Sequence, residues 1–142
     1  MNIRTQLLHP DALLPVYATS GAAAFDLFSL DACTLYAHGT ATFRTGLAFE
    51  IPEGHVMLVY SRSGHGFRNS ISLVNSVGVI DADFRGEVMV KLRNDGEAAV
   101  EFPPHSRVAQ AMIVPVPRVA FEVAHELSQT ARDTGGLGST GT

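Results

Sequence analysis

Two aspartates at the end of an apolar segment are the residues best suited to acid–base chemistry. Asp81 and Asp83 follow Gly78-Val79-Ile80, and their spacing of two would place both on one face if a strand ran through them. A carboxylate at a strand end, held near a phosphate, can orient and deprotonate a water molecule. Both aspartates are also common turn formers, with Gly86 supplying a bend, so this segment alone leaves the two interpretations open.

A short segment near the middle of the chain has the residue types that bind phosphate. In Ser61-Arg62-Ser63-Gly64, the arginine and a hydroxyl can donate to phosphate oxygens, and the glycine allows a close backbone approach. On its own, such a segment is more often a turn with a solvated arginine. The segment therefore indicates a phosphate site only if other residues support it.

Three more polar residues carry weaker signals. Asn75 could cap a turn or could meet the edge of a base through its amide. Gln110, in Arg107-Val108-Ala109-Gln110, could face a pocket or could be one more exposed residue of an alternating strand. Asp26 follows a turn of small residues and, taken alone, is interpreted as a solvated or capping acid.

The last segment has an unusual composition. Residues 133–142 read D-T-G-G-L-G-S-T-G-T, which offers almost no apolar surface to offset the cost of ordering the backbone. It could be a frayed terminus, or an arm that orders over a phosphate chain through its amides, its hydroxyls and Arg132. We predict a single β domain over residues 1–131 and a flexible arm over residues 132–142.

The elements that must position these residues are predicted to be short strands. Two turn signals are clear: Pro52-Glu53-Gly54 ends one strand, and Asp95-Gly96 predicts a tight hairpin. One or two helical turns fit near residues 64–70. Many short strands without a long helical period predict an all-β sandwich, jelly roll or barrel. Residue composition and alternation predict strands at 3–8, 41–51, 55–60, 77–80, 88–93, 100–102, 108–116 and 119–123.

Composition restricts the class of protein and of partner. The 142 residues are 46% apolar and 17% charged, which is typical of one globular domain. The net charge of −4 argues against general affinity for nucleic acid. Because Lys91 is the only lysine, an anionic ligand would have to be met locally by arginines and backbone amides.

Several kinds of site and location are not expected. The single cysteine, Cys33, rules out an internal disulfide and a multi-cysteine zinc site, and the six histidines are scattered without metal-ligand spacing. There is no lysine-containing phosphate loop and no G-x-S-x-G elbow. No apolar run approaches the ~20 residues of a membrane span, and we find no signal-peptide pattern. We therefore expect a cytoplasmic protein that binds neither membrane nor nucleic acid.

Taken together and in this order, the segments make the chain resemble the homotrimeric dUTPase family along nearly its whole length. That family carries five ordered motifs. They stand here as Ala23-Ala24-Phe25-Asp26-Leu27, Ser61-Arg62-Ser63-Gly64, Gly78-Val79-Ile80-Asp81 through Phe84-Arg85-Gly86-Glu87, Arg107-Val108-Ala109-Gln110, and Arg132 through Gly135-Gly136-Leu137-Gly138-Ser139-Thr140-Gly141.

The resemblance implies an all-β fold, a distorted jelly roll or β-clip-like barrel, assembled as a homotrimer. It implies three sites at subunit junctions, each closed by a glycine-rich arm. The implied reaction is hydrolysis of dUTP to dUMP and pyrophosphate, with Asp81 orienting the water that attacks the α-phosphate. This reaction would supply dUMP for thymidylate synthesis and keep uracil out of DNA.

The resemblance also assigns roles to individual residues, and the implied cofactor is Mg²⁺. The triphosphate and water molecules would coordinate the ion. Asp26 would not bind it directly and would contact it through one of these waters. Phe84 would lie under the deoxyribose and leave no room for a 2′-hydroxyl. Uracil would be bound by Asn75, Val79 and Ile80 with Met89 nearby, the phosphates by Arg62, Ser63, Gly64 and Gln110, and the γ-phosphate would be covered by Arg132 with Leu137, Gly138 and Ser139.

This chain departs from the family pattern at three positions. Phe84 stands where the family usually has tyrosine, so the steric block remains but the hydroxyl is lost. Leu137 stands where the arm usually has an aromatic residue, which predicts weaker closure because stacking on a base contributes ~1–3 kcal/mol. Asp133 replaces a common glycine and adds negative charge near the γ-phosphate.

Three other functions are weighed against hydrolysis. A dCTP deaminase shares the fold but lacks an aspartate at the position of Asp81, so the intact motif argues against it. A regulator that binds nucleotide only to signal to a partner protein is compatible as an added role. A purely structural or lectin-like sandwich leaves the order of the five motifs unexplained.

Overall fold

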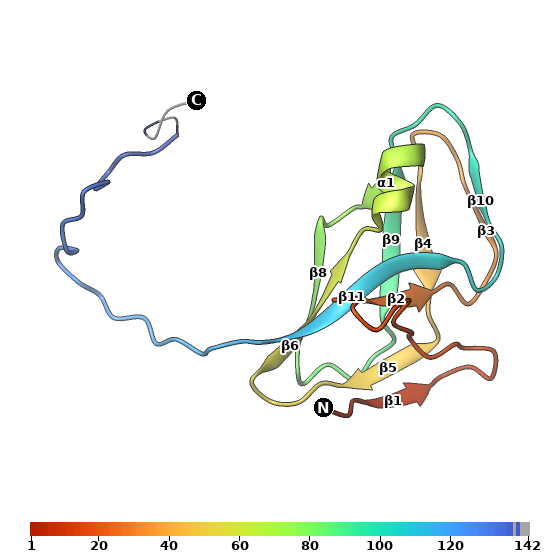
Figure 1. Cartoon of the computed structure of the whole chain (residues 1–142), viewed down its shortest axis with the longest axis horizontal. Coiled ribbons are helices and arrows are strands. Elements are labelled where there is room, and N and C mark those ends of the chain that lie inside the picture. The colour runs from red at the N-terminus through yellow and green to blue at the C-terminus, as the bar shows by residue number, and fades with distance from the viewer. Residues whose placement is uncertain (138, 140–142) are drawn as a thin grey trace.

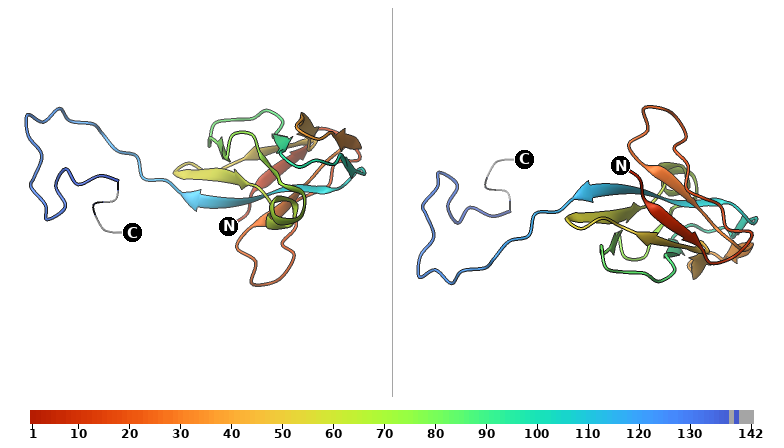
Figure 2. Two further views of the ribbon diagram at one scale, coloured as in Figure 1. Left: turned by 90° about the horizontal axis from the view of Figure 1, so that it is seen from above. Right: turned by 90° about the horizontal axis from the view of Figure 1, so that it is seen from below.

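The structure, a computed structural model, describes residues 1–137 and 139, and its folded part is built almost entirely from short antiparallel strands. Eleven strands and one short helix form the body, and the chain beyond the last strand extends far from it (Figure 1). Views from above and below show the same separation (Figure 2). Val116 N–H makes the last backbone bond to the body, to the Gly54 carbonyl at 2.7 Å.

The first sheet contains the segments that carry most of the candidate residues. Its strand order is β2-β11-β6-β8, and every neighbouring pair is antiparallel. The long strand β11 lies in the middle because it pairs with β2 on one side and β6 on the other, whereas β8 forms an edge. The bounds are β2 Phe25–Phe28, β6 His55–Tyr60, β8 Val77–Ile80 and β11 Arg107–Pro115.

A second sheet, in the order β4-β9-β7, packs against the first. Its central strand buries Val90, Leu92 and Asn94 and exposes the residues between them, which is the period-two pattern of a strand with one face in a core. Two small sheets, β1-β5 and β10-β3, complete the body. The bounds are β1 Arg4–Leu7, β3 Cys33–Leu35, β4 Thr40–Arg44, β5 Leu47–Glu50, β7 Ile71–Leu73, β9 Met89–Asn94 and β10 Val100–Phe102.

The core lies between the sheets and confirms the predicted fold class. Phe43 and Phe102 meet edge to face at 5.0 Å between ring centroids, and each is almost fully buried. The helix α1, Ser63–Asn69, occupies the place predicted for one or two helical turns. The fold is all-β and jelly-roll-like, but the sheets do not close into a barrel.

The strand predicted at residues 41–51 is wrong as a single element. The chain forms β4 and β5 in different sheets, with a sharp corner at Gly46, whose φ is +68°. A Cβ at Gly46 would lie 2.8 Å from the Cβ of Ala12, so both the backbone angle and the close approach require glycine. Alternation along the segment is continuous, so it does not reveal this corner.

The hairpin predicted at Asp95-Gly96 is also wrong. β9 pairs with β4 and β7, and β10 pairs with β3, so the strands on either side of this turn are not partners. Gly96 does not have a positive φ. It is needed for space, since a Cβ there would lie 3.0 Å from the Asn69 carbonyl oxygen.

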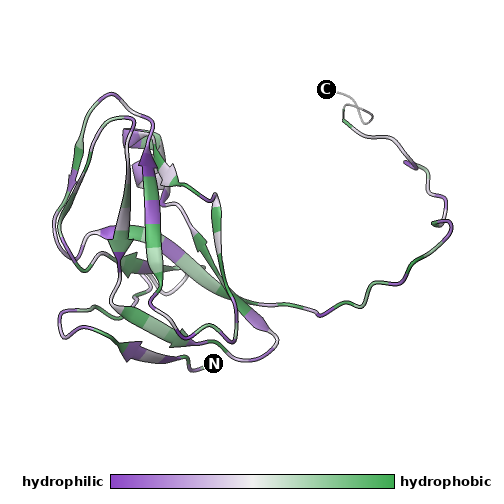
Figure 3. Ribbon diagram, turned by 180° about the vertical axis from the view of Figure 1, so that it is seen from behind, coloured by the Kyte–Doolittle hydropathy of each residue, from purple (hydrophilic) through white to green (hydrophobic). Residues whose placement is uncertain are grey.

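The strand predicted at residues 119–123 is absent from the described chain. Val119, Phe121 and Val123 lie in an extended segment and are 70%, 96% and 101% exposed. Apolar and polar residues are mixed along this part of the chain (Figure 3). The departure from the body falls at residue 117, and the division after residue 131 stays a prediction.

Candidate active site

One group of candidate residues gathers around a buried carboxylate. Asp26 on β2 has a side chain only 9% exposed, so the interpretation of this residue as a solvated acid is wrong. Arg62 Nε donates to Asp26 Oδ1 at 2.9 Å, and Arg107 Nε lies 3.5 Å from Oδ2. One carboxylate between two guanidinium groups leaves the group with one net positive charge and fixes both arginines.

Gln110 joins this group because of a β-bulge in β11. The register pairs Arg107 with Phe28, Ala109 with Leu27 and Gln110 with Asp26, so Val108 is the extra residue. Without a bulge, positions 107 and 110 would point to opposite faces; with it, both lie beside Asp26. Gln110 Nε2 donates to the Ser61 carbonyl at 2.9 Å.

The segment after β6 turns directly into α1 beside this group. Arg62 is the extended residue before the helix, and its carbonyl accepts from His65 N–H and Gly66 N–H, each at 3.1 Å. The N–H groups of Ser63 and Gly64 come first in the helix and so have no helical partner. Ser61, in contrast, accepts a bond from Leu73 N–H through its hydroxyl at 2.8 Å, which is a structural use of that side chain.

These residues line a cleft that suits a polyanion. The cleft has a volume of 600 Å³ and combines arginine, amide and hydroxyl groups with the small residues of the first motif. Its lining includes Ala22, Ala23, Ala24, Asp26, Tyr60, Ser61, Arg62 and Gln110. Arg62 is the arginine in this lining, and its side chain is 27% exposed, so a ligand in the cleft can reach it.

The second group lies at the far end of β8. The strand ends at Ile80, and Phe84 N–H then donates to the Asp81 carbonyl at 3.2 Å, which closes a four-residue turn. The prediction that a strand carries Asp81 and Asp83 on one face is therefore wrong. Both aspartates lie in a turn, but β8 and β9 belong to different sheets, so the turn does not join a hairpin. Both carboxylates are exposed and line a cleft of 920 Å³ together with Arg85.

Phe84 is positioned by a glycine two residues later. A Cβ at Gly86 would lie 2.6 Å from the Phe84 ring, so the ring lies directly against that backbone. The following Glu87 accepts from Gly46 N–H at 2.8 Å and pairs with Arg44 at 3.2 Å, which ties this segment to the corner between β4 and β5. Phe84 itself stays 43% exposed and can form one wall of a binding site.

Of the residues predicted to bind uracil, Val79 and Ile80 lie on the edge strand β8, and Met89 begins β9. Within residues 1–137 and 139, β8 pairs only with β6, so its other side leaves backbone donors and acceptors without a strand partner there. Val79 and Met89 are 61% and 58% exposed. Asn75 lies in the exposed turn before the strand, where Ser76 has a φ of +60°. An edge of this kind can bind a base through main-chain hydrogen bonds.

A single chain does not bring the two groups together. Tyr60 of β6 is opposite Val77, and Met57 is opposite Ile80, so Arg62 and Asp81 follow opposite ends of the same strand pair. At ~3.3 Å per residue, the six positions from Val56 to Arg62 correspond to roughly 20 Å. Within one chain the two groups are therefore separated by about the length of this strand pair.

The predicted arm residues lie away from both groups. Arg132 Nε donates to the Gly135 carbonyl at 2.9 Å, and Leu137 is fully exposed on the extended segment (Figure 1). Ser139 is exposed as well. Gly138 falls outside the described residues.

Two residues in these groups were not singled out from the sequence. Arg107 stood only within a motif, because the bulge that turns it toward Asp26 has no signal in the sequence. Arg85 also stood only within a motif, whereas in the structure Arg85 Nη1 donates to the Ala82 and Phe84 carbonyls at 2.6 and 2.9 Å. Its position is the signal that could have indicated this role, because an arginine directly after a predicted turn can donate back to the carbonyls of that turn.

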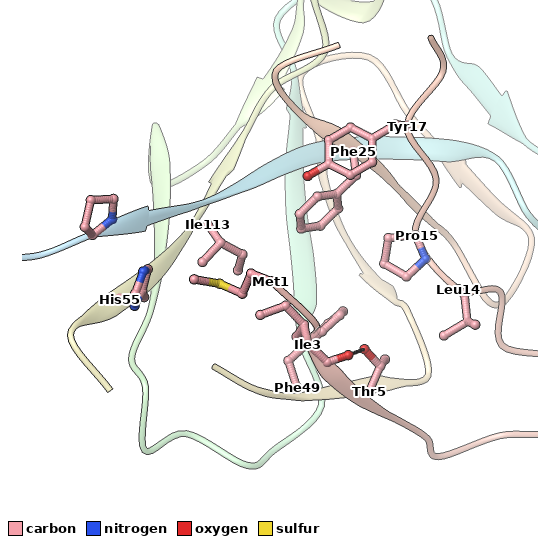
Figure 4. Close-up of a pocket in the computed structure, with 11 residues that line it drawn as sticks. Met1, Ile3, Thr5, Leu14, Pro15, Tyr17, Phe25, Phe49, His55 and Ile113 are labelled. Atoms are coloured by element: carbon pink, nitrogen blue, oxygen red, sulfur yellow. Dashed lines mark hydrogen bonds between the residues drawn. The ribbon is translucent and has the colours of Figure 1, made fainter. Parts of the chain in front are cut away.

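A third pocket has a different character. It is a groove of 780 Å³ beside β1, lined mainly by apolar side chains such as Ile3, Phe49 and Ile113 (Figure 4). It contains no arginine or lysine, so it does not suit a triphosphate.

The described residues also bear on metal and membrane binding. Among residues 1–137 and 139, no three histidine, cysteine or carboxylate side chains are placed to hold a metal ion. Within the same residues, no helix has the length and apolar character needed to cross a membrane.

Comparisons with known proteins agree on one family. A family model described as dUTPase matches residues 11–141. The deoxyuridine 5′-triphosphate nucleotidohydrolase of Picosynechococcus sp. is 40% identical over 142 residues, covering 100% of both chains, and that of Hydrogenobaculum sp. is 42% identical over 99% of both. The Staphylococcus bacteriophage 80alpha dUTPase, solved with dUPNHPP, superposes with a TM-score of 0.92 at 25% identity and covers 99% of each chain.

Proposed function

The chain belongs to the dUTPase family, and from this premise we propose that it hydrolyses dUTP to dUMP and pyrophosphate. The observation that carries the proposal is the turn at Asp81. It places an exposed carboxylate at the end of an edge strand, inside the matched region and beside a free main-chain edge. Among the residues that the structure describes, no cation pairs with Asp81.

In the proposed reaction, Asp81 takes a proton from a water molecule while the water oxygen bonds to the α-phosphorus. The bond from that phosphorus to the bridging α–β oxygen breaks, and pyrophosphate leaves. Such a reaction needs positioning and charge neutralisation more than covalent help from the protein. A carboxylate with no paired cation suits the role of base.

The substrate would be held by the two groups of residues described above. Uracil would bind Asn75 and the main chain at Val79 and Ile80, with Met89 beside it. Phe84 would pack under the deoxyribose, where a 2′-hydroxyl would collide with its ring. Arg62, Ser63, Gly64 and Gln110 would bind the phosphates, and Arg132, Leu137, Gly138 and Ser139 would close over them.

A magnesium ion fits this site only if the substrate carries it. Both oxygens of Asp26 face arginines, so that carboxylate suits an outer contact through water better than direct coordination. When bound, the ion would offset charge on the triphosphate. The solved dUTPase variant from phage phi11 of S. aureus coordinates a structural Mg(II) ion.

We further propose that the working unit is a homotrimer with sites at its subunit junctions. The support is the distance between the groups: Asp81 of one subunit can meet Arg62 and Gln110 of a neighbour, although they lie at opposite ends of β6 within one chain. A cytoplasmic location and the supply of dUMP for thymidylate synthesis belong to the same proposal.

The test is pyrophosphate release with dUTP, dTTP, dCTP and UTP assayed in parallel, with Asp81→Asn as the control variant. We expect hydrolysis almost confined to dUTP and abolished in the variant. Equal activity on all four nucleotides would remove the claim of uracil and deoxyribose specificity. Ammonia release from dCTP would instead identify a deaminase.

A further inference from the structure

The loop that carries Asp81 is held by few bonds. Strand pairing stops at Ile80 and resumes at Met89, and the Asp81–Phe84 turn contains one backbone hydrogen bond, at 3.2 Å. The turn lies at the edge of its sheet, so no neighbouring strand supports it from outside. Its shape therefore depends on side chains.

Arg85 supplies the support. Its Nη1 donates to the Ala82 carbonyl at 2.6 Å and to the Phe84 carbonyl at 2.9 Å. These carbonyls belong to two peptide planes, one inside the turn and one just after it. A single nitrogen that bonds to both fixes how the two planes face each other, and thereby holds the shape of the turn that begins at Asp81.

The guanidinium is not engaged by an acid. Arg85 lines the same cleft as Asp81 and Asp83, yet within the described part of the chain no carboxylate lies at ion-pair distance from it. Its side chain is exposed, and both of its hydrogen bonds go to carbonyls of this segment. Replacing it should therefore disturb the turn without disturbing the core.

We infer that Arg85 is a positioning residue: it braces the turn so that the Asp81 carboxylate points at the water it activates. The inference rests on the proposed function and adds a residue to it. Rates are sensitive to such placement, since a displacement of about 1 Å can cost on the order of 100-fold. Because one backbone bond remains in the turn, we expect a loss of about tenfold in kcat for Arg85→Gln.

The experiment compares the full-length Arg85→Gln, Arg85→Lys and Arg93→Gln variants with the parent. Arg93 is a matched control because it is a half-exposed arginine that pairs with Asp95 on a different sheet. We measure kcat and KM for dUTP, and separately the dissociation constant for dUpNHpp. Arg85→Gln should lose about tenfold in kcat and change the dissociation constant by less than about threefold. Arg85→Lys, which keeps one donor group, should recover part of the rate, and Arg93→Gln should match the parent.

A double variant tests whether Arg85 acts through Asp81. Asp81→Asn abolishes turnover in the steady-state assay, so its residual hydrolysis is followed in single turnovers at high enzyme concentration. In that background Arg85→Gln should cause no further loss of the residual rate, because the group that it positions is already gone. A full additional loss would overturn the inference. So would a binding loss for dUpNHpp as large as the loss in kcat, because Arg85 would then be a substrate contact.

The two failures can be told apart. If the parent does not hydrolyse dUTP, the proposed function fails. If the parent does hydrolyse it and Arg85→Gln keeps the parent kcat, only the inference about Arg85 fails. Thermal unfolding of each variant shows whether a loss of kcat comes from the turn alone or from a destabilised fold. If Arg85→Gln does not fold, Arg85→Lys is compared with the parent in its place.

Discussion

The backbone at Gly86 leaves no room for a side chain beside the Phe84 ring. The ring lies so close to Gly86 that a methyl group there would start 2.6 Å from it. We expect Gly86→Ala to push the ring from its place, because Phe84 is half-exposed and can move more cheaply than the backbone. The preference for dUTP over UTP, as the ratio of the two kcat/KM values, should fall about tenfold below that of the parent. This fall corresponds to ~1.4 kcal/mol of lost discrimination.

The measurement is the ratio of kcat/KM for dUTP to that for UTP. Gly21→Ala is a suitable control, since it also replaces a turn glycine but its Cβ would meet nothing within 4 Å. An unchanged ratio in Gly86→Ala would mean that Phe84 does not exclude the 2′-hydroxyl.

Leu137 is one of the two arm residues, with Asp133, that are predicted to depart from the family pattern. The side chain is fully exposed in the extended segment. We expect Leu137→Phe to lower KM for dUTP by up to roughly tenfold, since stacking on a base contributes ~1–3 kcal/mol. Steady-state kinetics check this, with Leu127→Phe as a control on the same segment. A KM that does not fall would show that this position does not touch the base.

At the scale of elements, residues 119–123 have the alternating sequence of a strand, but in the described chain they pair with no other strand. Its alternating Val119, Phe121 and Val123 are exposed in the single chain, which is costly for large apolar side chains in water. We expect these residues to pair and bury only when chains assemble. Amide hydrogen exchange should therefore show protection of 119–123 at high protein concentration, and loss of that protection when dilution separates the chains.

The residues of 128–134 provide the internal control for that measurement. They are polar or small and exposed, and we expect them to exchange quickly at every concentration without nucleotide. Fast exchange of 119–123 in the assembled protein would contradict the prediction.

Local signals predicted most elements but not their partners. Strands β6 and β9 lie within one residue of the strands predicted at 55–60 and 88–93, and α1 lies within one residue of the helical turns predicted at 64–70. The division of 41–51 at Gly46 and the unpaired turn at Asp95-Gly96 depend on contacts with Ala12 and Asn69, which are distant in sequence. Steric limits of that kind are set by the folded neighbours, so local pattern cannot reveal them.

In the candidate site too, residues with a local sequence signal were predicted, and arrangements that depend on distant contacts were missed. Asp81 and Arg62 were predicted from segments that carry their own chemistry. The burial of Asp26 between two arginines was not, because it requires a bulge at Val108 and the pairing of β2 with β11. Family resemblance supplied the grouping of these segments, which one chain by itself does not bring to one place.

At the scale of the whole molecule, that separation makes a direct prediction. Asp81 and Arg62 lie at opposite ends of one strand pair, so the proposed site would need two chains. Neither Asp81→Asn nor Arg62→Gln should be active alone. Unfolding the two variants together and refolding the mixture should create junctions in which one chain supplies Asp81 and its neighbour supplies Arg62.

With random mixing, about one junction in four combines both intact residues, so the refolded mixture should show about a quarter of the parent activity. Pyrophosphate release from dUTP measures it. The same variants mixed without unfolding are the control, and they should stay inactive for as long as the chains do not exchange. If the refolded mixture is as inactive as its components while it assembles normally, both residues serve a site within one chain, and the nucleotide must then bridge the length of β6 by a rearrangement of the loop after Ile80.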